Sequence, residues 1–379
     1  MELFFGIITG LLILAALVVA HELGHAIAAR RNGVVVEEFG VGFPPSAFKK
    51  KLKSGTVFSL NWIPLGGFVK LQGEYDSARK KGDYGAVSFR QKTKILLSGV
   101  AVNWLLAALL LTVLALTGLP KVLPNQVSVL GDTTIVNQPV EITALTKDYP
   151  AQKSGFKVGD KIIRFAGYEV PTADRLIEIS KQKKGQSVAV IYNRKGVEYN
   201  KNVTLRNSSS GGLFGASLGQ REMIKSTWSA PIVGVATTAQ FSWLTLQGVG
   251  QLIGDLTSGL VSQLNPNSAI REQASKDLNK VGDSVAGPIG ILGTIFPAAQ
   301  QAGLTQLIFL TAIISLSLAV MNILPIPSLD GGRWLTMALF KLFKKKLTKK
   351  REERIQTIGF SILMCLVILV TFADVSKLF

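Results

Sequence analysis

The stretch His21-Glu22-Leu23-Gly24-His25 follows an apolar run that begins at Leu3 and is interrupted only by glycine and threonine. It contains both of the histidines in the 379-residue chain. On a helix, side chains four residues apart share one face, so the two imidazoles can bind a single zinc ion. The glutamate between them is the residue that zinc sites with this spacing use as a general base. The stretch therefore predicts a membrane-spanning helix that carries a metal-dependent catalytic site.

The composition of the whole chain is typical of a membrane protein. Hydrophobic residues make up 47%, charged residues only 17%, and the mean hydropathy is +0.34. The net charge of +18 gathers in short segments beside the apolar runs, which is typical of topology signals and of contact with anionic lipids. We therefore expect the lipid bilayer to be a partner and nucleic acid not to be one.

Four apolar segments approach the roughly 20 residues that a bilayer core requires. The first is interpreted as a retained helix and not a signal peptide, because Glu2 replaces a basic N-terminal region and the run is too long. Cys365 lies in the fourth segment and is the only cysteine, so an intrachain disulfide is excluded and we expect an ordinary apolar role. The predicted spans are residues 3–29, 95–119, 304–324 and 358–372.

Positive charge predicts how these segments are oriented. Residues 30–94 contain 13 Lys or Arg against 5 Asp or Glu, and residues 341–354 contain 8 against 2. Because short cytoplasmic connections are rich in Lys and Arg, we expect both segments to be cytoplasmic. The long connection 121–303, with 19 against 13, and both termini would then be extracytoplasmic. The two histidines would lie within the membrane, near its cytoplasmic side.

A small soluble domain is expected between about residues 127 and 217. Strand-like stretches alternate with turn residues, one helix is predicted over 173–181, and a Ser/Gly cluster at 208–212 indicates a flexible exit. Residues 223–264 then predict one or two amphipathic helices, which can lie in the membrane interface or pack on the neighbouring domain. The strand-like stretches are 140–145, 161–165 and 187–192.

A catalytic zinc site usually has three protein ligands and one open position. The chain has no third histidine, so the remaining ligand must be a carboxylate or come from a partner. Asp330 is the prominent candidate, because acids beside apolar spans are costly and rare. It follows Pro325 and Pro327, which must break a helix, and irregular backbone at membrane depth is tolerated where it lines a cavity. Without the histidine pair, Asp330 would be interpreted as an ordinary helix cap.

Together, the two motifs resemble those of the site-2 protease family of intramembrane zinc metalloproteases, and of its bacterial RseP and RasP type in particular. Residues 21–25 match the family's HExxH motif, and residues 322–332 match its N-x-x-P-x-P-x-L-D-G-G element. The resemblance covers nearly the whole chain. The implied Zn2+ ligands are His21, His25 and Asp330, and the implied catalytic base is Glu22.

Further elements resemble parts of the same family. Gly66-Gly67-Phe68-Val69-Lys70 resembles a membrane re-entrant β-hairpin whose edge can pair with an unwound substrate, the alternative being an ordinary surface hairpin. Asn103 and Asn322 can each hydrogen-bond near the substrate or join two helices, and for Asn322 we favour substrate binding. Gly287-Pro288-Ile289-Gly290 resembles the start of the third helix, where we expect a structural role. The predicted substrate-binding residues are Asn103, Asn322, Gly66, Gly67 and Phe68.

The soluble domain resembles a PDZ domain of the bacterial protease type. The similarity lies in residues 151–163, where Gly155 and Gly159 fit the turn before a strand. Enterobacterial relatives of this type have two such domains, and this chain has room for one. A single PDZ domain can bind a peptide terminus or act as a steric filter, and the sequence favours neither.

The fold implied by the resemblance is that of a mainly α membrane protein. It has four transmembrane helices, a membrane re-entrant β-hairpin at about residues 55–72 and an inserted α+β PDZ domain. The expected location is the bacterial inner membrane. The predicted division is 1–120 for the first half of the protease core, 121–218 for the PDZ domain, 219–303 for a peripheral helical region and 304–379 for the second half of the core.

The implied function is that of a zinc metalloendopeptidase that cleaves transmembrane segments of single-span proteins, such as an anti-sigma factor or a remnant signal peptide. A non-catalytic scaffold with a PDZ module is a second hypothesis. It predicts that the glutamate or a metal ligand has been lost, and here all four residues are present. A metal-ion transporter is a third, and it predicts a path of several intramembrane acids or histidines. Only Glu22 and Asp330 stand out as intramembrane acids, which favours the protease.

Overall fold

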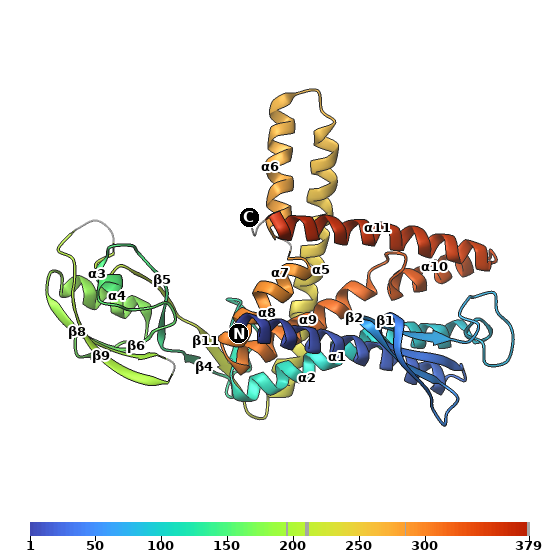
Figure 1. Cartoon of the computed structure of the whole chain (residues 1–379), viewed down its shortest axis with the longest axis horizontal. Coiled ribbons are helices and arrows are strands. Elements are labelled where there is room, and N and C mark those ends of the chain that lie inside the picture. Colours follow the sequence, from blue (N-terminus) through green and yellow to red (C-terminus); the bar gives the residue numbers. More distant parts are fainter. Residues whose placement is uncertain (195, 209–211, 285, 377–379) are drawn as a thin grey trace. The chain divides into compact units, whose positions relative to one another are not determined.

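The computed structural model describes residues 1–194, 196–208, 212–284 and 286–376, which form two compact units. The first unit comprises Met1–Val113 and Gly234–Phe379, and the second comprises Leu114–Val233 (Figure 1). The second unit is therefore inserted in the sequence between the two halves of the first.

Four helices are long and apolar enough to cross a membrane: α1 (Glu2–Arg31), α2 (Phe89–Thr117), α9 (Leu304–Ile323) and α11 (Lys349–Ser376). Each of the four predicted spans falls on one of them. Helix α11 begins nine residues before the predicted fourth span, because its first turns are charged and still helical. Lys, Arg and Glu are good helix formers, so hydropathy alone could not locate this start.

A long β-hairpin, β1 (Val36–Lys51) and β2 (Val57–Leu71), connects α1 to the short helix η1 (Tyr84–Ala86) and then to α2. The hairpin predicted at about 55–72 covers only its second strand, because the first strand passes through Pro44 and Pro45, which are unfavourable within strands, and ends in exposed lysines. Both strands bend, so that residues 38–41 pair with 57–60 on one side and with 67–70 on the other. The segment 67–71 is consequently an outer edge of the hairpin.

The segment between α9 and α10 (Asp330–Leu342) is irregular, as the prolines predict. Helix α9 ends at Ile323, and α10 begins at Asp330 itself, with Leu329 as a cap residue that has no side-chain bond. Ser328 has a φ of +83°, a conformation that few residues with a side chain adopt. Asp330 is thus placed at the first turn of a new helix.

Further helices precede the third span. Helices α5 (Ala230–Gln263) and α6 (Ser268–Ser284) form a helical hairpin, followed by α7 (Pro288–Gly290), the π-helical turn η2 (Ile291–Ile295) and α8 (Phe296–Gln301). Gly287–Gly290 is therefore not the start of the third span. The first half of α5 contacts other helices, because Phe241 packs on Phe309 of α9 and Ser242 bonds Trp104 of α2.

The second unit contains a sheet in the order β10-β5-β6-β8-β9, with β7 paired to β6. Its three predicted strands and its predicted helix, α4 (Ala173–Gln182), are present. Met223, predicted to begin a helix, lies in β11, and residues 209–211 of the predicted exit lie outside the described residues. The remaining elements are β3 (Leu119–Pro120), β4 (Thr134–Asn137), β5 (Val140–Leu145), α3 (Pro150–Lys153), β6 (Lys161–Phe165), β7 (Tyr168–Glu169), β8 (Ser187–Arg194), β9 (Val197–Thr204), β10 (Ala216–Gly219) and β11 (Glu222–Lys225).

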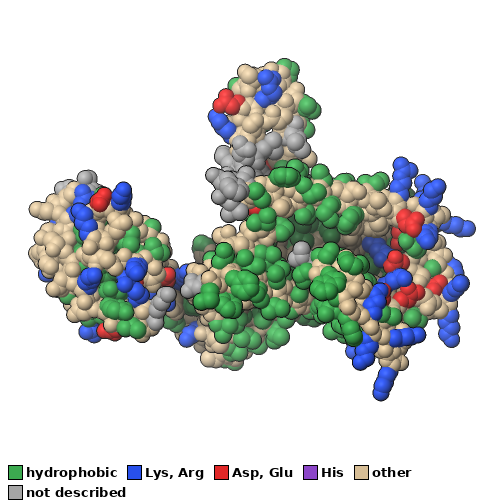
Figure 2. Space-filling view, viewed as in Figure 1, with side chains coloured by type: hydrophobic (Ala, Val, Ile, Leu, Met, Phe, Trp, Pro, Cys, Tyr) green, Lys and Arg blue, Asp and Glu red, His purple; other side chains and the backbone are tan. Residues whose placement is uncertain are grey.

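The surface of the first unit separates by chemistry. Hydrophobic side chains gather over the middle of this unit, whereas Lys and Arg gather over the hairpin and the α10–α11 connection (Figure 2). The exposed cations include Lys49, Lys50 and Lys51 of the hairpin and Lys344 and Lys345 of the connection. The two basic segments, far apart in the sequence, therefore lie at one end of this unit.

Candidate active site

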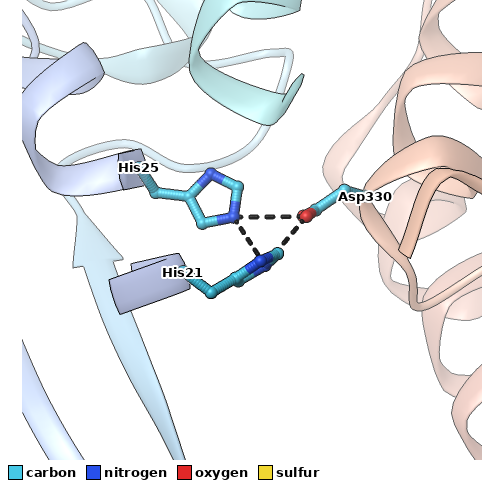
Figure 3. Close-up of side chains that lie close together, drawn as sticks. All are labelled: His21, His25 and Asp330. Atoms are coloured by element: carbon cyan, nitrogen blue, oxygen red, sulfur yellow. Dashed lines mark hydrogen bonds and ion pairs between the residues drawn. The ribbon is translucent and has the colours of Figure 1, made fainter. Parts of the chain in front are cut away.

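His21 and His25 of α1 point toward Asp330 of α10 (Figure 3). The Nε2 atoms of the two histidines are 3.1 Å apart, and each is 3.2 Å from Oδ2 of Asp330. Both histidines are buried, and Asp330 is half-buried. Helix α1 supplies the pair through its four-residue spacing, while the helix break after α9 brings the carboxylate from a distant part of the sequence.

The three atoms form a nearly equilateral triangle, which fits one face of a metal tetrahedron. Zinc bonds of about 2.0–2.1 Å to nitrogen and oxygen imply ligand atoms roughly 3.3 Å apart in tetrahedral geometry. Two imidazoles and one carboxylate are also the ligand set of several catalytic zinc sites, with the fourth position open. Across the described residues, this is the one group of three or more His, Cys, Asp or Glu side chains with ligand atoms within 4.8 Å.

The orientation of His25 suits metal binding through Nε2. Its Nδ1 atom lies 2.8 Å from the carbonyl oxygen of Ile95 on α2, to which it donates a hydrogen bond. With the hydrogen on Nδ1, the lone pair of Nε2 is free for a metal. Helix α2 can approach so closely because Gly99 faces the pair: a Cβ atom there would lie 2.4 Å from Nε2 of His25.

Asn103 of α2 contacts the second nitrogen of His21. Its side chain is fully buried, and its amide nitrogen Nδ2 lies 3.4 Å from Nδ1 of His21. Its Oδ1 atom has no hydrogen-bond partner. The backbone oxygen of Asn103 accepts a hydrogen bond from Ser315 of α9. This residue therefore lies behind a histidine and also joins two helices, so a role at the substrate stays a prediction.

Glu22 lies beside the edge segment of the hairpin. Its carboxyl group lies near the backbone of Val69, and a Cβ atom on Gly67 would lie 3.4 Å from its Cγ atom. The glutamate is half-buried on α1, between the two histidines in sequence. Glu22 and an extended edge strand are thus brought together at the histidine pair.

The other predicted substrate-binding residues lie nearby in the fold but contact neither histidine in the described geometry. Gly66 has a φ of +85° and sits against the ring of Phe43, and Phe68 sits against Gly40 across the hairpin. Asn322 is half-buried in the last turn of α9. Their roles remain predictions.

Sequence reasoning missed a polar cavity of about 350 Å³ that reaches Asp330. Its walls include Tyr75, Arg333, Glu352 and Gln356, which come from three separate segments. Two acids inside the otherwise basic stretch 341–354 were the available signal, since such acids are out of place in a plain lipid-binding segment. The contact between His25 and the carbonyl oxygen of Ile95 could not be predicted from the sequence, because every residue has a backbone carbonyl.

The chain matches peptidase family M50 over residues 9–366. It belongs to this family. A protein of Clostridium perfringens named "Putative zinc metalloprotease" is 30% identical over 97% of this chain and 98% of its own. The zinc metalloprotease RasP of Geobacillus kaustophilus is 25% identical over 98% of each chain.

Membership of the M50 family makes this protein a zinc metalloprotease with Zn2+ as its cofactor, and its four apolar helices make it an integral membrane protein. Among solved structures, the PDZ domain of an SdrC-like protein from Listeria monocytogenes is similar to 24% of this chain and 93% of its own. That similarity has 22% identity and a TM-score of 0.20.

Proposed function

We propose that this M50 protein is a site-2-type intramembrane endopeptidase that cleaves transmembrane segments of single-span proteins. The triangle formed by His21, His25 and Asp330, on helices that are apolar enough to lie in a bilayer, carries this proposal. An anti-sigma factor or a remnant signal peptide fits the substrate class, because each presents an apolar helix with one scissile region.

The three side chains of the triangle would hold Zn2+ through the Nε2 atoms of His21 and His25 and a carboxylate oxygen of Asp330. When bound, zinc lowers the pKa of water toward about 7 and polarises the scissile carbonyl. Glu22 would accept the proton of the attacking water and pass it to the leaving amine. Nδ2 of Asn103 lies 3.4 Å from Nδ1 of His21 and Oδ1 has no partner; with the side-chain amide turned over, Oδ1 would accept a hydrogen bond from Nδ1 of His21, which keeps Nε2 of that histidine free.

A transmembrane helix must unwind before a peptide bond can reach the site, because its backbone is closed by internal hydrogen bonds. The edge segment 67–71 would hold the unwound strand by β-augmentation, with Gly66, Gly67 and Phe68 next to it. Its position beside Glu22 supports this role. The hairpin would dip into the membrane there, with exposed Trp62 and Ile63 against lipid.

The two basic segments at one end of the first unit support a cytoplasmic location for the hairpin and the α10–α11 connection. With four spans, both termini and the second unit would be extracytoplasmic, on the outer side of a bacterial inner membrane. The proposed division retains residues 1–120 and 304–379 as protease core, 121–218 as a PDZ domain and 219–303 as a region that is helical after β11.

The second unit would act as a PDZ module that admits or binds substrate. A groove of about 350 Å³ lies between α4 and β10, with Leu176 and Phe214 in its apolar wall. Lys181 and Lys184 also line it and would favour an acidic or carboxylate-bearing peptide. A steric filter needs no such groove, so the groove favours peptide binding.

The proposal predicts that Glu22→Gln abolishes cleavage of a single-span model substrate but leaves about one zinc per chain, because glutamine cannot accept the proton and is not a ligand. Rate loss should be on the order of 10²-fold or more. The measurement compares cleavage and zinc content of purified wild type and variant in detergent. Near-normal cleavage by Glu22→Gln would show that Glu22 is not the catalytic base. Zinc in both proteins with cleavage by neither would favour a non-catalytic scaffold.

A further inference from the structure

The Asp330 carboxylate belongs to a segment that cannot position itself. Residues 324–329 are irregular, so they lack the hydrogen bonds of a regular helix, whereas His21 and His25 are fixed on one continuous helix. A metal ligand has to be held within about 0.5 Å of its productive position. Contacts from outside the segment must therefore determine where Asp330 lies.

Helix α11 supplies those contacts from one face. Residues 352, 356 and 359 are spaced by four and three, so they share a side of the helix. Oε1 of Gln356 accepts a hydrogen bond of 2.6 Å from the backbone N–H of Ser328. A Cβ atom on Gly359 would lie 2.3 Å from the carbonyl oxygen of Pro327, so helix and segment touch backbone to backbone.

Glu352 connects α11 to Arg333, which lies one helical turn after Asp330. Its Oε1 atom is 3.4 Å from Nε of Arg333, and its Oε2 atom accepts a hydrogen bond of 2.9 Å from the backbone N–H of Asp76. The side chain of Glu352 is only 2% exposed. An acid buried to this degree needs a partner, and Arg333 supplies it.

Arg333 extends the connection to the segment before α2. Its Nη2 atom donates a hydrogen bond to the carbonyl oxygen of Glu74, and its guanidinium lies 4.9 Å from the centroid of the Tyr84 ring. Burial raises the pKa of Tyr84 well above its ordinary value, so the phenol stays neutral beneath this cation. Arg333 and Glu352 therefore join α10, α11 and the 74–84 segment.

We propose that this face of α11, with Arg333, is a brace that positions Asp330 and thereby determines zinc affinity. Glu352, Gln356 and Arg333 are positioning residues, because none of them touches the triangle of ligand atoms in the described geometry. A buried ion pair adds little net stability compared with apolar packing, so fixed geometry is the better explanation for this one. The inference rests on the proposed ligand set.

The test measures the zinc Kd of the full-length protein in detergent by competition with a chromophoric chelator, and the absorption spectrum of the Co2+-loaded protein. Glu352→Gln is expected to raise the zinc Kd roughly 10–100-fold, as loss of a residue that orients a ligand usually does. Gln356→Ala is expected to act in the same direction. Both should shift the Co2+ bands, which a purely structural role would leave in place.

Glu353→Gln is the matched control, because Glu353 is the next residue of α11, is half-exposed and pairs with Lys349 at 3.8 Å. It should leave the zinc Kd and the Co2+ bands unchanged. The double variant Arg333→Gln/Glu352→Gln should bind zinc no more weakly than the weaker of its two single variants, since both changes remove one ion pair.

Wild-type zinc Kd and Co2+ bands in both Glu352→Gln and Gln356→Ala would overturn the brace. If Glu352→Gln does not fold, Gln356→Ala and Gly359→Ala carry the same test. Asp330→Ala separates the two proposals: if it binds zinc as the wild type does, the ligand set is wrong. If Asp330→Ala loses zinc while the brace variants keep it, only the brace is wrong.

Discussion

At the scale of single residues, the site depends on a glycine as well as on its metal-binding side chains. The Ile95 carbonyl can meet His25 because Gly99 removes a side chain from the surface of α2 that faces both histidines. The His pair and Asp330 could be identified from the sequence, because ionisable side chains are rare in apolar segments. Gly99 carried no such signal, because glycines are frequent in membrane helices for many reasons.

Gly99→Ala is predicted to weaken zinc binding by at least roughly tenfold, because the added methyl would lie 2.4 Å from Nε2 of His25 and force the imidazole or the helix to move. Zinc content after dialysis against a weak chelator measures this. Gly248→Ala on α5 is the control, because a methyl there meets open space. Equal zinc retention in the two variants would show that α2 yields without disturbing the site.

At the scale of elements, the sequence predicted those with a periodic or apolar signal and missed those set by pairing. The three strands and the helix α4 of the second unit lie where alternation and turn residues placed them. The first strand of the hairpin, Val36–Lys51, was missed because long-range pairing holds its exposed lysines in a strand. The contact of α5 with α2 and α9 was equally invisible, since it joins residues far apart in the sequence.

The start of α5 offers a prediction about pH. Asp132 accepts hydrogen bonds from the side chains of Ser229 and Thr227 and from their backbone N–H groups, which lowers its pKa to about 2. Because the folded-state pKa lies below the ordinary value of about 3.9, the stabilisation is complete above that value and is lost as pH falls toward 2. Asp132→Asn should therefore reduce the fall in melting temperature between pH 5 and pH 3, measured by thermal unfolding in detergent. An unchanged fall would mean that other acids dominate.

At the scale of the whole molecule, the two halves of the first unit are separated in sequence by the second unit and still share one site. The histidines come from the first half and Asp330 from the second. This explains why the motifs could be found separately in the sequence while their contact could not. Because the basic segments 30–94 and 341–354 also lie at one end of this unit, we expect them to face the same side of the membrane.

That expectation predicts a labelling pattern. In a Cys365→Ser background, which removes the chain's one thiol, a membrane-impermeant maleimide should label Lys157→Cys of the second unit in intact cells. Lys50→Cys of the hairpin and Lys345→Cys of the α10–α11 connection should be labelled only after the membrane is opened, because all three positions are exposed and differ only in side. Opposite labelling of Lys50→Cys and Lys345→Cys would be incompatible with a single site built from both halves. If both positions are labelled before permeabilisation, the shared site is still possible, but the proposed orientation in the membrane is reversed.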